Sequence, residues 1–293
     1  MDMGETPIHD MEVTMSTFTN RATLTYRGVT ASSNTVTGEI IGVLTAEKSA
    51  LSPDYSAGTG VTYVISLLNS GDTALTGVTV TDDLGADGGS APLTYVPGSA
   101  VWFLDGVRQS SVTVSNNGGL VFSDITVPAN GSSLIVYDTD VNAFAPLSQG
   151  SGIVNTAVVT GPGISGVEAG AEVPAAVSPA LSVVKALSPL TVKENGTVTY
   201  TFTIENSGNI PADAEDCVIL EDVFDPILSG VTAVLDGTEL EETSGYTYDP
   251  LTGEFRTVSG VITVPAASYS RSGTGETVVV PGRTVLTVTG AVA

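Results

Sequence analysis

The chain of 293 residues contains a long internal repeat. The segment 63–71 (YVISLLNSG) returns as 200–208 (YTFTIENSG), and the segment 124–129 (DITVPA) returns as 261–266 (VITVPA). A repeat of this length implies two tandem units that share one fold. We place the two units at residues 41–175 and 176–293.

Each unit consists of short strand-like runs separated by turn residues. Thr199 and Thr201 alternate with Tyr200 and Phe202, which is the period of a strand with one wet and one dry face. Asn-Ser-Gly and proline-containing connections follow at the short spacing of an antiparallel sandwich. The predicted fold class is all-β, with two tandem immunoglobulin-like antiparallel β-sandwich domains and an additional N-terminal strand.

One strand of the first unit has no counterpart in the second. The segment 153–159 (IVNTAVV) closes the first unit, whereas the second unit stops at Ala293, before such a strand. The matching segment is 18–24 (FTNRATL) near the N-terminus, where Asn20 corresponds to Asn155. Because an open sheet edge templates the addition of another strand, we expect the second unit to accept this strand from another copy. The donor strand carries Phe18, Asn20, Ala22, Leu24 and Tyr26.

We therefore predict a head-to-tail polymer of identical subunits. Residues 1–16 are expected to form a flexible arm, and residues 17–40 a donor strand and linker. Donor and acceptor lie at opposite ends of the chain, so the contact is heterologous and we expect an open fibre. The alternative is a monomeric surface module for adhesion or binding.

In each unit a lysine, an asparagine and an aspartate are in phase with apolar residues of their strands. Two interpretations remain open. In the first, they form a hydrogen-bonded polar trio, as burial requires. In the second, burial favours a neutral lysine amine and a protonated aspartate, and the acid relays protons while a Lys–Asn isopeptide bond forms and ammonia leaves. The intrachain set is Lys48, Asn155 and Asp82, and the interchain set is Lys185, Asn20 and Asp222.

Charge and composition exclude several classes of function. The net charge of −23, with nine basic and 32 acidic residues, argues against nucleic acid and anionic membranes as partners. We find no transmembrane run and no signal-peptide h-region, so no membrane insertion is expected. The one histidine, His9, has no Ser/His or metal-spaced cluster around it in the sequence. We expect no cofactor, and no enzyme activity beyond autocatalytic isopeptide formation. Weaker candidates for calcium ligands, whose spacing matches no defined loop, are Asp54, Asp72, Asp82, Asp83 and Asp87.

These motifs resemble the DUF11 family of bacterial surface repeats. The resemblance rests on the lysine near the first strand, a tyrosine-containing strand ending in Asn-x-Gly, the V-x-V-x-D strand at 78–82 and the N-x-A-x-V strand at 155–159. It covers nearly all of residues 17–293 and implies an immunoglobulin-like sandwich in an extracellular appendage of a cell or spore surface. The Lys, Asn and acid trio is also similar, in residue types, to that of isopeptide-bonded Gram-positive pilin domains. We find no sortase motif, which favours self-assembly.

Overall fold

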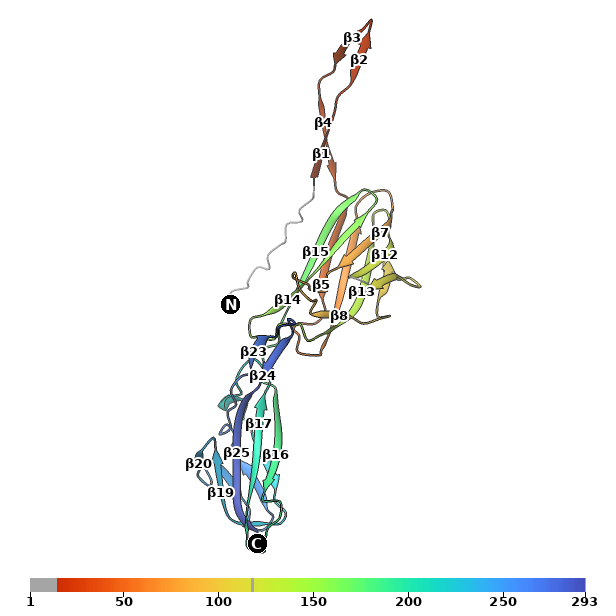
Figure 1. Cartoon of the computed structure of the whole chain (residues 1–293). Coiled ribbons are helices and arrows are strands. Elements are labelled where there is room, and N and C mark those ends of the chain that lie inside the picture. The colour runs from red at the N-terminus through yellow and green to blue at the C-terminus, as the bar shows by residue number, and fades with distance from the viewer. Residues whose placement is uncertain (1–14, 117–118, 293) are drawn as a thin grey trace, which may run out of the picture.

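The computed structural model describes residues 15–116 and 119–292 of the chain. Three parts follow one another along its length: an N-terminal ribbon, domain one and domain two (Figure 1). The one helical element among the described residues is η1 (Ala214–Asp216), a single 3-10 turn. The prediction of two tandem antiparallel β-sandwiches is confirmed. Most of the predicted flexible arm, including His9, lies outside the described residues.

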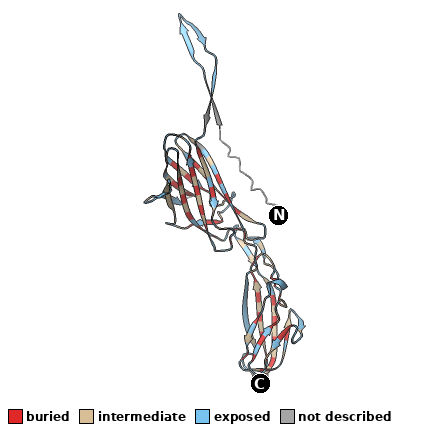
Figure 2. Cartoon of the chain, turned by 180° about the vertical axis from the view of Figure 1, so that it is seen from behind, coloured by how far each residue is buried: buried red, intermediate tan, exposed pale blue. Residues whose placement is uncertain are grey.

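The strands form because apolar residues recur at every second position. In β6 (Gly60–Asn69), Tyr63, Ile65 and Leu67 are buried, while the residues between them are only partly buried. Such alternation places one row of side chains in the core of a sandwich. Figure 2 shows the result, with buried residues along the inner faces of both domains and exposed residues over the ribbon tip.

Domain one is built from two packed sheets. The first has the order β10-β9-β13-β6-β5, and the short strand β8 also pairs with β13. The second has the order β11-β12-β7-β14-β15. The first sheet consists of β5 (Leu44–Ala50), β6, β8 (Leu93–Tyr95), β9 (Val101–Leu104), β10 (Val107–Arg108) and β13 (Gly131–Val141). The second sheet consists of β7 (Leu75–Asp82), β11 (Thr113–Asn116), β12 (Leu120–Val127), β14 (Gly152–Gly161) and β15 (Ile164–Pro174).

Domain two repeats the first sheet and shortens the second. Its five-stranded sheet, β16-β17-β25-β19-β20, follows the strand order of domain one. The opposing sheet has three described strands, β18-β22-β21, where domain one has five. Among the described residues of domain two, no strand corresponds to β14 or β15. The strands are β16 (Leu181–Ser188), β17 (Thr197–Asn206), β18 (Glu221–Val223), β19 (Leu228–Leu235), β20 (Thr238–Leu240), β21 (Tyr246–Tyr248), β22 (Glu254–Thr257) and β25 (Gly282–Val292).

The N-terminal ribbon is a two-stranded antiparallel hairpin. β1 (Met15–Asn20) pairs with β4 (Val36–Ile41), and β2 (Thr23–Tyr26) pairs with β3 (Val29–Ser32). Arg27 and Gly28 form the turn with φ values of 46° and 82°, the left-handed conformation that a tight two-residue hairpin loop requires. The segment predicted as a donor strand and linker is therefore folded on itself. Its second half was expected to be a linker, but it contains β3 and β4, which pair with β2 and β1.

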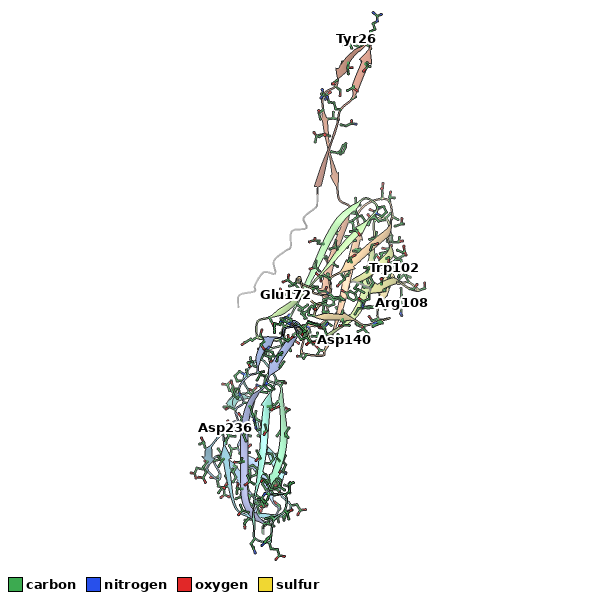
Figure 3. The ribbon with its side chains drawn as sticks, in the orientation of Figure 1. Tyr26, Trp102, Arg108, Asp140, Glu172 and Asp236 are labelled. Atoms are coloured by element: carbon green, nitrogen blue, oxygen red, sulfur yellow. The ribbon has the colours of Figure 1, made fainter. Side chains whose placement is uncertain are left out.

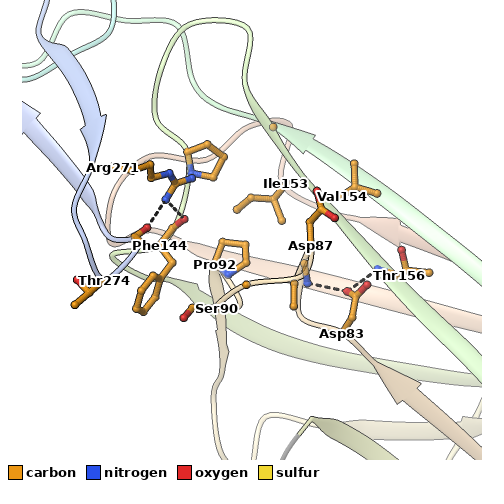
Figure 4. A pocket seen from close by; sticks show the side chains of 16 residues that line it. Asp83, Asp87, Ser90, Pro92, Phe144, Ile153, Val154, Thr156, Arg271 and Thr274 are labelled. Atoms are coloured by element: carbon orange, nitrogen blue, oxygen red, sulfur yellow. Dashed lines mark hydrogen bonds between the residues drawn. The ribbon is translucent and has the colours of Figure 1, made fainter.

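A second hairpin, β23 (Ser268–Arg271) and β24 (Thr277–Val280), links domain two to domain one. The backbone N–H of Thr277 donates to the carbonyl of Ala143 at 2.7 Å. The guanidinium of Arg271 donates to the carbonyl of Phe144 at 2.7 Å (Figure 4). These contacts, together with the linker that follows β15, hold the two sandwiches end to end. No helix in the described part of the chain has the length and hydrophobicity needed to span a bilayer.

Candidate functional site

The structure brings the predicted intrachain trio together in the core of domain one. Lys48 lies on the inner face of β5 and is only 7% exposed. Asp82, at the end of β7, and Asn155, on β14, are completely buried. β7 and β14 are neighbours, with Ala157 directly opposite Asp82. Asn155 is two residues before Ala157 on β14 and therefore lies on the same inward face.

Asp82 is the centre of this cluster. Its Oδ2 accepts from the Lys48 ammonium at 2.7 Å and also from the Tyr137 hydroxyl. Its Oδ1 accepts from the backbone N–H of Leu84 at 2.9 Å. Asn155 Nδ2 lies 3.4 Å from the Tyr137 hydroxyl, so Tyr137 connects the acid to the amide. Asp82 thus contacts the amine of Lys48 directly and the amide of Asn155 through Tyr137.

Two tyrosines of this cluster were missed by the sequence reasoning. Tyr137 lies on β13 directly opposite Tyr63 on β6, and both side chains are completely buried. The Lys48 Nζ lies 5.0 Å from the centre of the Tyr63 ring. The sequence did contain a signal for them. Both tyrosines occupy inward positions of strands with apolar alternation, and a buried tyrosine hydroxyl needs a polar partner.

The cluster is not a fully satisfied polar trio. Asn155 Oδ1 and the Tyr63 hydroxyl are buried and have no hydrogen-bond partner among the described residues. The Asn155 amide lies within hydrogen-bonding reach of the Tyr63 hydroxyl, and the alternative amide orientation exchanges the places of Oδ1 and Nδ2. Both interpretations drawn from the sequence therefore remain open for this cluster.

Burial changes the acid–base properties of the cluster. Desolvation lowers the pKa of Lys48, and the attraction of Asp82 only partly opposes this effect. Desolvation and the nearby Asp82 raise the pKa of Tyr137, so its hydroxyl stays protonated. The neutral amine of Lys48, which is the nucleophilic form, is therefore more accessible than in an exposed lysine.

Domain two holds an incomplete version of the same cluster. Lys185 contacts Asp222, and its Nζ lies 4.6 Å from the centre of the Tyr200 ring. The Lys185 side chain is 41% exposed, whereas that of Lys48 is fully buried. Val288 occupies the position of Tyr137, since it lies opposite Tyr200. The structure does not bring Asn20 to this lysine within one chain, because domain one separates the ribbon from domain two (Figure 1).

The open side of domain two exposes apolar side chains. Within the described part of the chain, β18 is paired on one side only, with β22. Leu181 and Val183 share the inner face of β16 with Lys185, yet they are 40% and 58% exposed. The corresponding Leu44 of domain one is buried. The uncovered edge of β18 together with this face of β16 is called the acceptor edge below.

The predicted donor residues lie along the N-terminal side of the ribbon, on β1, on β2 and, for Ala22, between these two strands. Phe18, Leu24 and Tyr26 are 51%, 65% and 58% exposed, and Asn20 and Ala22 are also exposed. Tyr26 is at the ribbon tip and points away from the rest of the molecule (Figure 3). The structure thus places a row of exposed apolar side chains at one end of the molecule and the acceptor edge at the other.

The five weaker calcium candidates do not form a ligand group. Asp82 is committed to the buried cluster, and Asp83 accepts from the backbone N–H groups of Gly85 and Thr156. Within residues 15–116 and 119–292, no three His, Cys, Asp or Glu side chains are placed to share a metal ion. A cleft of about 780 Å³ lies where the domains meet, between the Asp83–Asp87 loop and Arg271 (Figure 4). Asp83, Val154 and Thr156, which are chain neighbours of Asp82 and Asn155, are among the residues that line it.

Three solved structures illustrate what the chain is similar to. The major pilin subunit BcpA of Bacillus cereus is 14% identical, with a TM-score of 0.35, and the match covers 91% of this chain and 73% of that one. The pilus backbone RrgB of Streptococcus pneumoniae is 13% identical, with a TM-score of 0.32 and coverage of 81% and 55%. A C-terminal fragment of the major pilin GBS80 of Streptococcus agalactiae is 11% identical, with a TM-score of 0.36 and coverage of 82% and 91%.

At these TM-scores the likeness carries no information on function, which is inferred instead from the geometry of the chain itself. No protein-family model matches the sequence, so the resemblance to DUF11 stays a prediction. No curated protein matches it either.

The two lysine–aspartate pairs predict different responses to the same substitution. In an Asn155→Ala background, where no Lys48–Asn155 bond can form, Asp82→Asn leaves the buried Lys48 without its counter-charge, so we expect domain one to lose about 3–5 kcal/mol of unfolding free energy. Asp222→Asn, the matched control, acts on a solvent-screened pair and should cost about 1 kcal/mol or less. Chemical denaturation of both variants measures the difference. Equal losses in the two domains would contradict the assignment of Asp82 as the centre of the cluster.

Proposed function

We propose that this protein is the structural subunit of an extracellular filament, a surface appendage of the type that the DUF11 resemblance implies. Copies join head to tail when the ribbon of one copy fills the acceptor edge of domain two in the next. The observation that carries the proposal is the contrast between the domains. In domain one β14 covers the edge of β7, whereas the equivalent edge of β18 is open and a strand of matching sequence is exposed on the ribbon.

Burial of apolar surface supplies the driving force. Phe18 and Leu24 of the donor, with Leu181 and Val183 of the acceptor, would leave water together. At roughly 1.5–3 kcal/mol for each large apolar side chain, the gross gain is about 10 kcal/mol, before the cost of association. Backbone hydrogen bonds to β18 add to this gain. The ribbon is already folded, so less conformational entropy is lost on docking than for an unfolded segment.

The arrangement of the parts favours an open filament over self-closure. The ribbon extends from the end of domain one that is remote from domain two (Figure 1). The contacts of Arg271 and Thr277 hold the two domains end to end, which opposes a fold-back. A donor and an acceptor at opposite ends make a heterologous contact, and such contacts propagate unless a rotation closes them into a ring.

We further propose that the lysine clusters lock the filament covalently. The neutral Lys48 amine attacks Asn155 Cγ, the new C–N bond forms, the Cγ–Nδ2 bond breaks, and ammonia leaves. The proton lost by Lys48 reaches the leaving nitrogen through Asp82, aided by the Tyr137 hydroxyl. No oxidant or cofactor is required. In domain two the same exchange would join Lys185 to Asn20 of the neighbouring copy, with Asp222 as the proton relay.

The donor face predicts which ribbon substitutions block assembly. The double variant Phe18→Asp/Leu24→Asp places charges on the face that would enter the core, so we expect monomers and no filaments. The control Thr19→Asp/Thr25→Asp places equal charges on the opposite face and should still assemble. Negative-stain electron microscopy and sedimentation in plain buffer measure the outcome. Filaments of normal length and yield from Phe18→Asp/Leu24→Asp would overturn the proposal of strand donation.

Covalent locking predicts a specific mass and gel pattern. Boiling filaments in denaturant should leave ladders of linked subunits, and Asn20→Ala should reduce these to single bands while filaments still form. Independently, the intact mass of the Asn20→Ala monomer should be lower than its sequence mass by one ammonia. The matched variant Asn155→Ala should lose this deficit. Monomer bands from boiled wild-type filaments would exclude the interchain bond, and a full sequence mass would exclude the intrachain bond.

A further inference from the structure

The ribbon and the β14–β15 hairpin of domain one have the same strand register. In the ribbon Asn20 lies opposite Val36 and Phe18 opposite Gly38. In the hairpin Asn155 lies opposite Ala171 and Ile153 opposite Val173. The two asparagines therefore have the same place in their hairpins, across from a small or medium apolar residue. The sequence match of the first strands alone would not require the second strands to pair in the same register, but they do.

The tips of the two hairpins also correspond. In both, the register shifts by one residue before the turn, and a two-residue loop follows. The loop of the ribbon joins Tyr26 to Val29, and the loop of the domain-one hairpin joins Gly161 to Ile164. The shift falls between Asn20 and Thr23 in the ribbon and between Val159 and Gly161 in the domain-one hairpin. The two hairpins therefore agree in the register at the asparagine and in the length of the loop, and differ in where the irregularity lies.

The facing pair at the base of the ribbon matches its counterpart in size. The Phe18 ring lies over Gly38 so closely that a Cβ on the glycine would be 2.5 Å from the ring. In domain one the same place is taken by Ile153 and Val173, both buried. A large and a small residue replace two of intermediate size, the kind of volume-conserving exchange that a packed core tolerates.

Each hairpin enters the following domain through the same backbone contact. After the ribbon, the carbonyl of Val43 accepts from the N–H of Ser70 at 2.9 Å. After the β14–β15 hairpin, the carbonyl of Ala180 accepts from the N–H of Ser207 at 2.9 Å. The contact that places the first strand of the next domain is therefore alike after the two hairpins, although the connection from β15 to β16 is longer than that from β4 to β5.

In domain one the second strand of the hairpin covers the lysine strand. Ala171 and Val173 of β15 are buried, and β15 packs beside β5, the strand that carries Lys48. β14, by contrast, forms its backbone ladder with β7. Without a counterpart of β15, the inner face of β16 stays open even after the edge of β18 is filled. The exposure of Val183 and Lys185 is the consequence.

We propose that the donated unit is the entire ribbon, a preformed two-stranded hairpin that enters domain two of a second copy of this chain. β1 and β2 extend the ladder of β18, with Ala22 opposite Asp222 as Ala157 lies opposite Asp82. β4 lies beside β16 and covers Val183 and Lys185. This inference rests on the proposed filament and specifies the junction between its subunits. At that junction the ribbon adds two strands to the three-stranded sheet of domain two, which then has five.

Substitutions on the second strand test this inference in the full-length protein. Val36→Asp places a charge on the face of β4 that would cover β16, and Val183→Asp does the same on the acceptor. Each should raise the concentration needed for half-maximal assembly by about tenfold or more. The controls Thr37→Asp and Val184→Asp carry the same charge on the opposite faces and should assemble like the wild type. Thermal unfolding of each monomer checks that the substituted residue, exposed in the monomer, leaves the fold intact.

The outcomes separate this inference from the proposed function. Normal assembly of Val36→Asp, combined with failure of Leu24→Asp and Val183→Asp, would overturn the hairpin inference and leave donation of the first strand standing. Normal assembly of all three variants would overturn both. Loss of assembly in Val36→Asp and Val183→Asp with their controls unaffected is the result that supports donation of the whole hairpin.

Discussion

A β-sandwich is stable only when the apolar inner faces of its two sheets are covered, and an edge strand beside an open inner face is a template for pairing with another chain. Domain one meets this requirement with its own hairpin, β14–β15, whose alanines and valines fill the gap between β7 and β5. Domain two presents the same core with that hairpin absent from its described residues. Among the described residues, the exposed face of β16 and the free edge of β18 follow directly from this difference, and under the proposed function a second copy would cover both.

Whether a hairpin covers the core also determines how far each lysine is exposed to solvent. Lys48 and Lys185 occupy equivalent positions, and each contacts an aspartate. The hairpin excludes water from Lys48 and lowers its pKa, whereas Lys185 remains in contact with solvent. Docking of the ribbon would bring Asn20 to Lys185 and remove water at the same moment. Covalent locking would then be limited to correctly assembled junctions, because only there is the amine desolvated beside its target.

Repetition and strand parity made much of this structure predictable from the sequence. The repeat gave the two sandwiches, and the phase of Lys48, Asp82 and Asn155 with apolar neighbours correctly indicated a shared interior. The ribbon was predicted as a strand and linker because its second half has to lead directly into domain one. Pairing across a hairpin is set by register, which parity within one strand does not reveal. Tyr137 was missed because domain two has Val288 in its place, so the repeat drew no attention to it.

The most direct test of the central claim is a high-resolution electron cryomicroscopy structure of filaments assembled from the wild-type protein. The account predicts that domain two in the polymer has a five-stranded second sheet, with two strands supplied by the ribbon of the adjacent subunit and Asn20 beside Lys185. A filament in which the ribbon stays in solvent, or in which the edge of β18 is covered by any other segment, would contradict it.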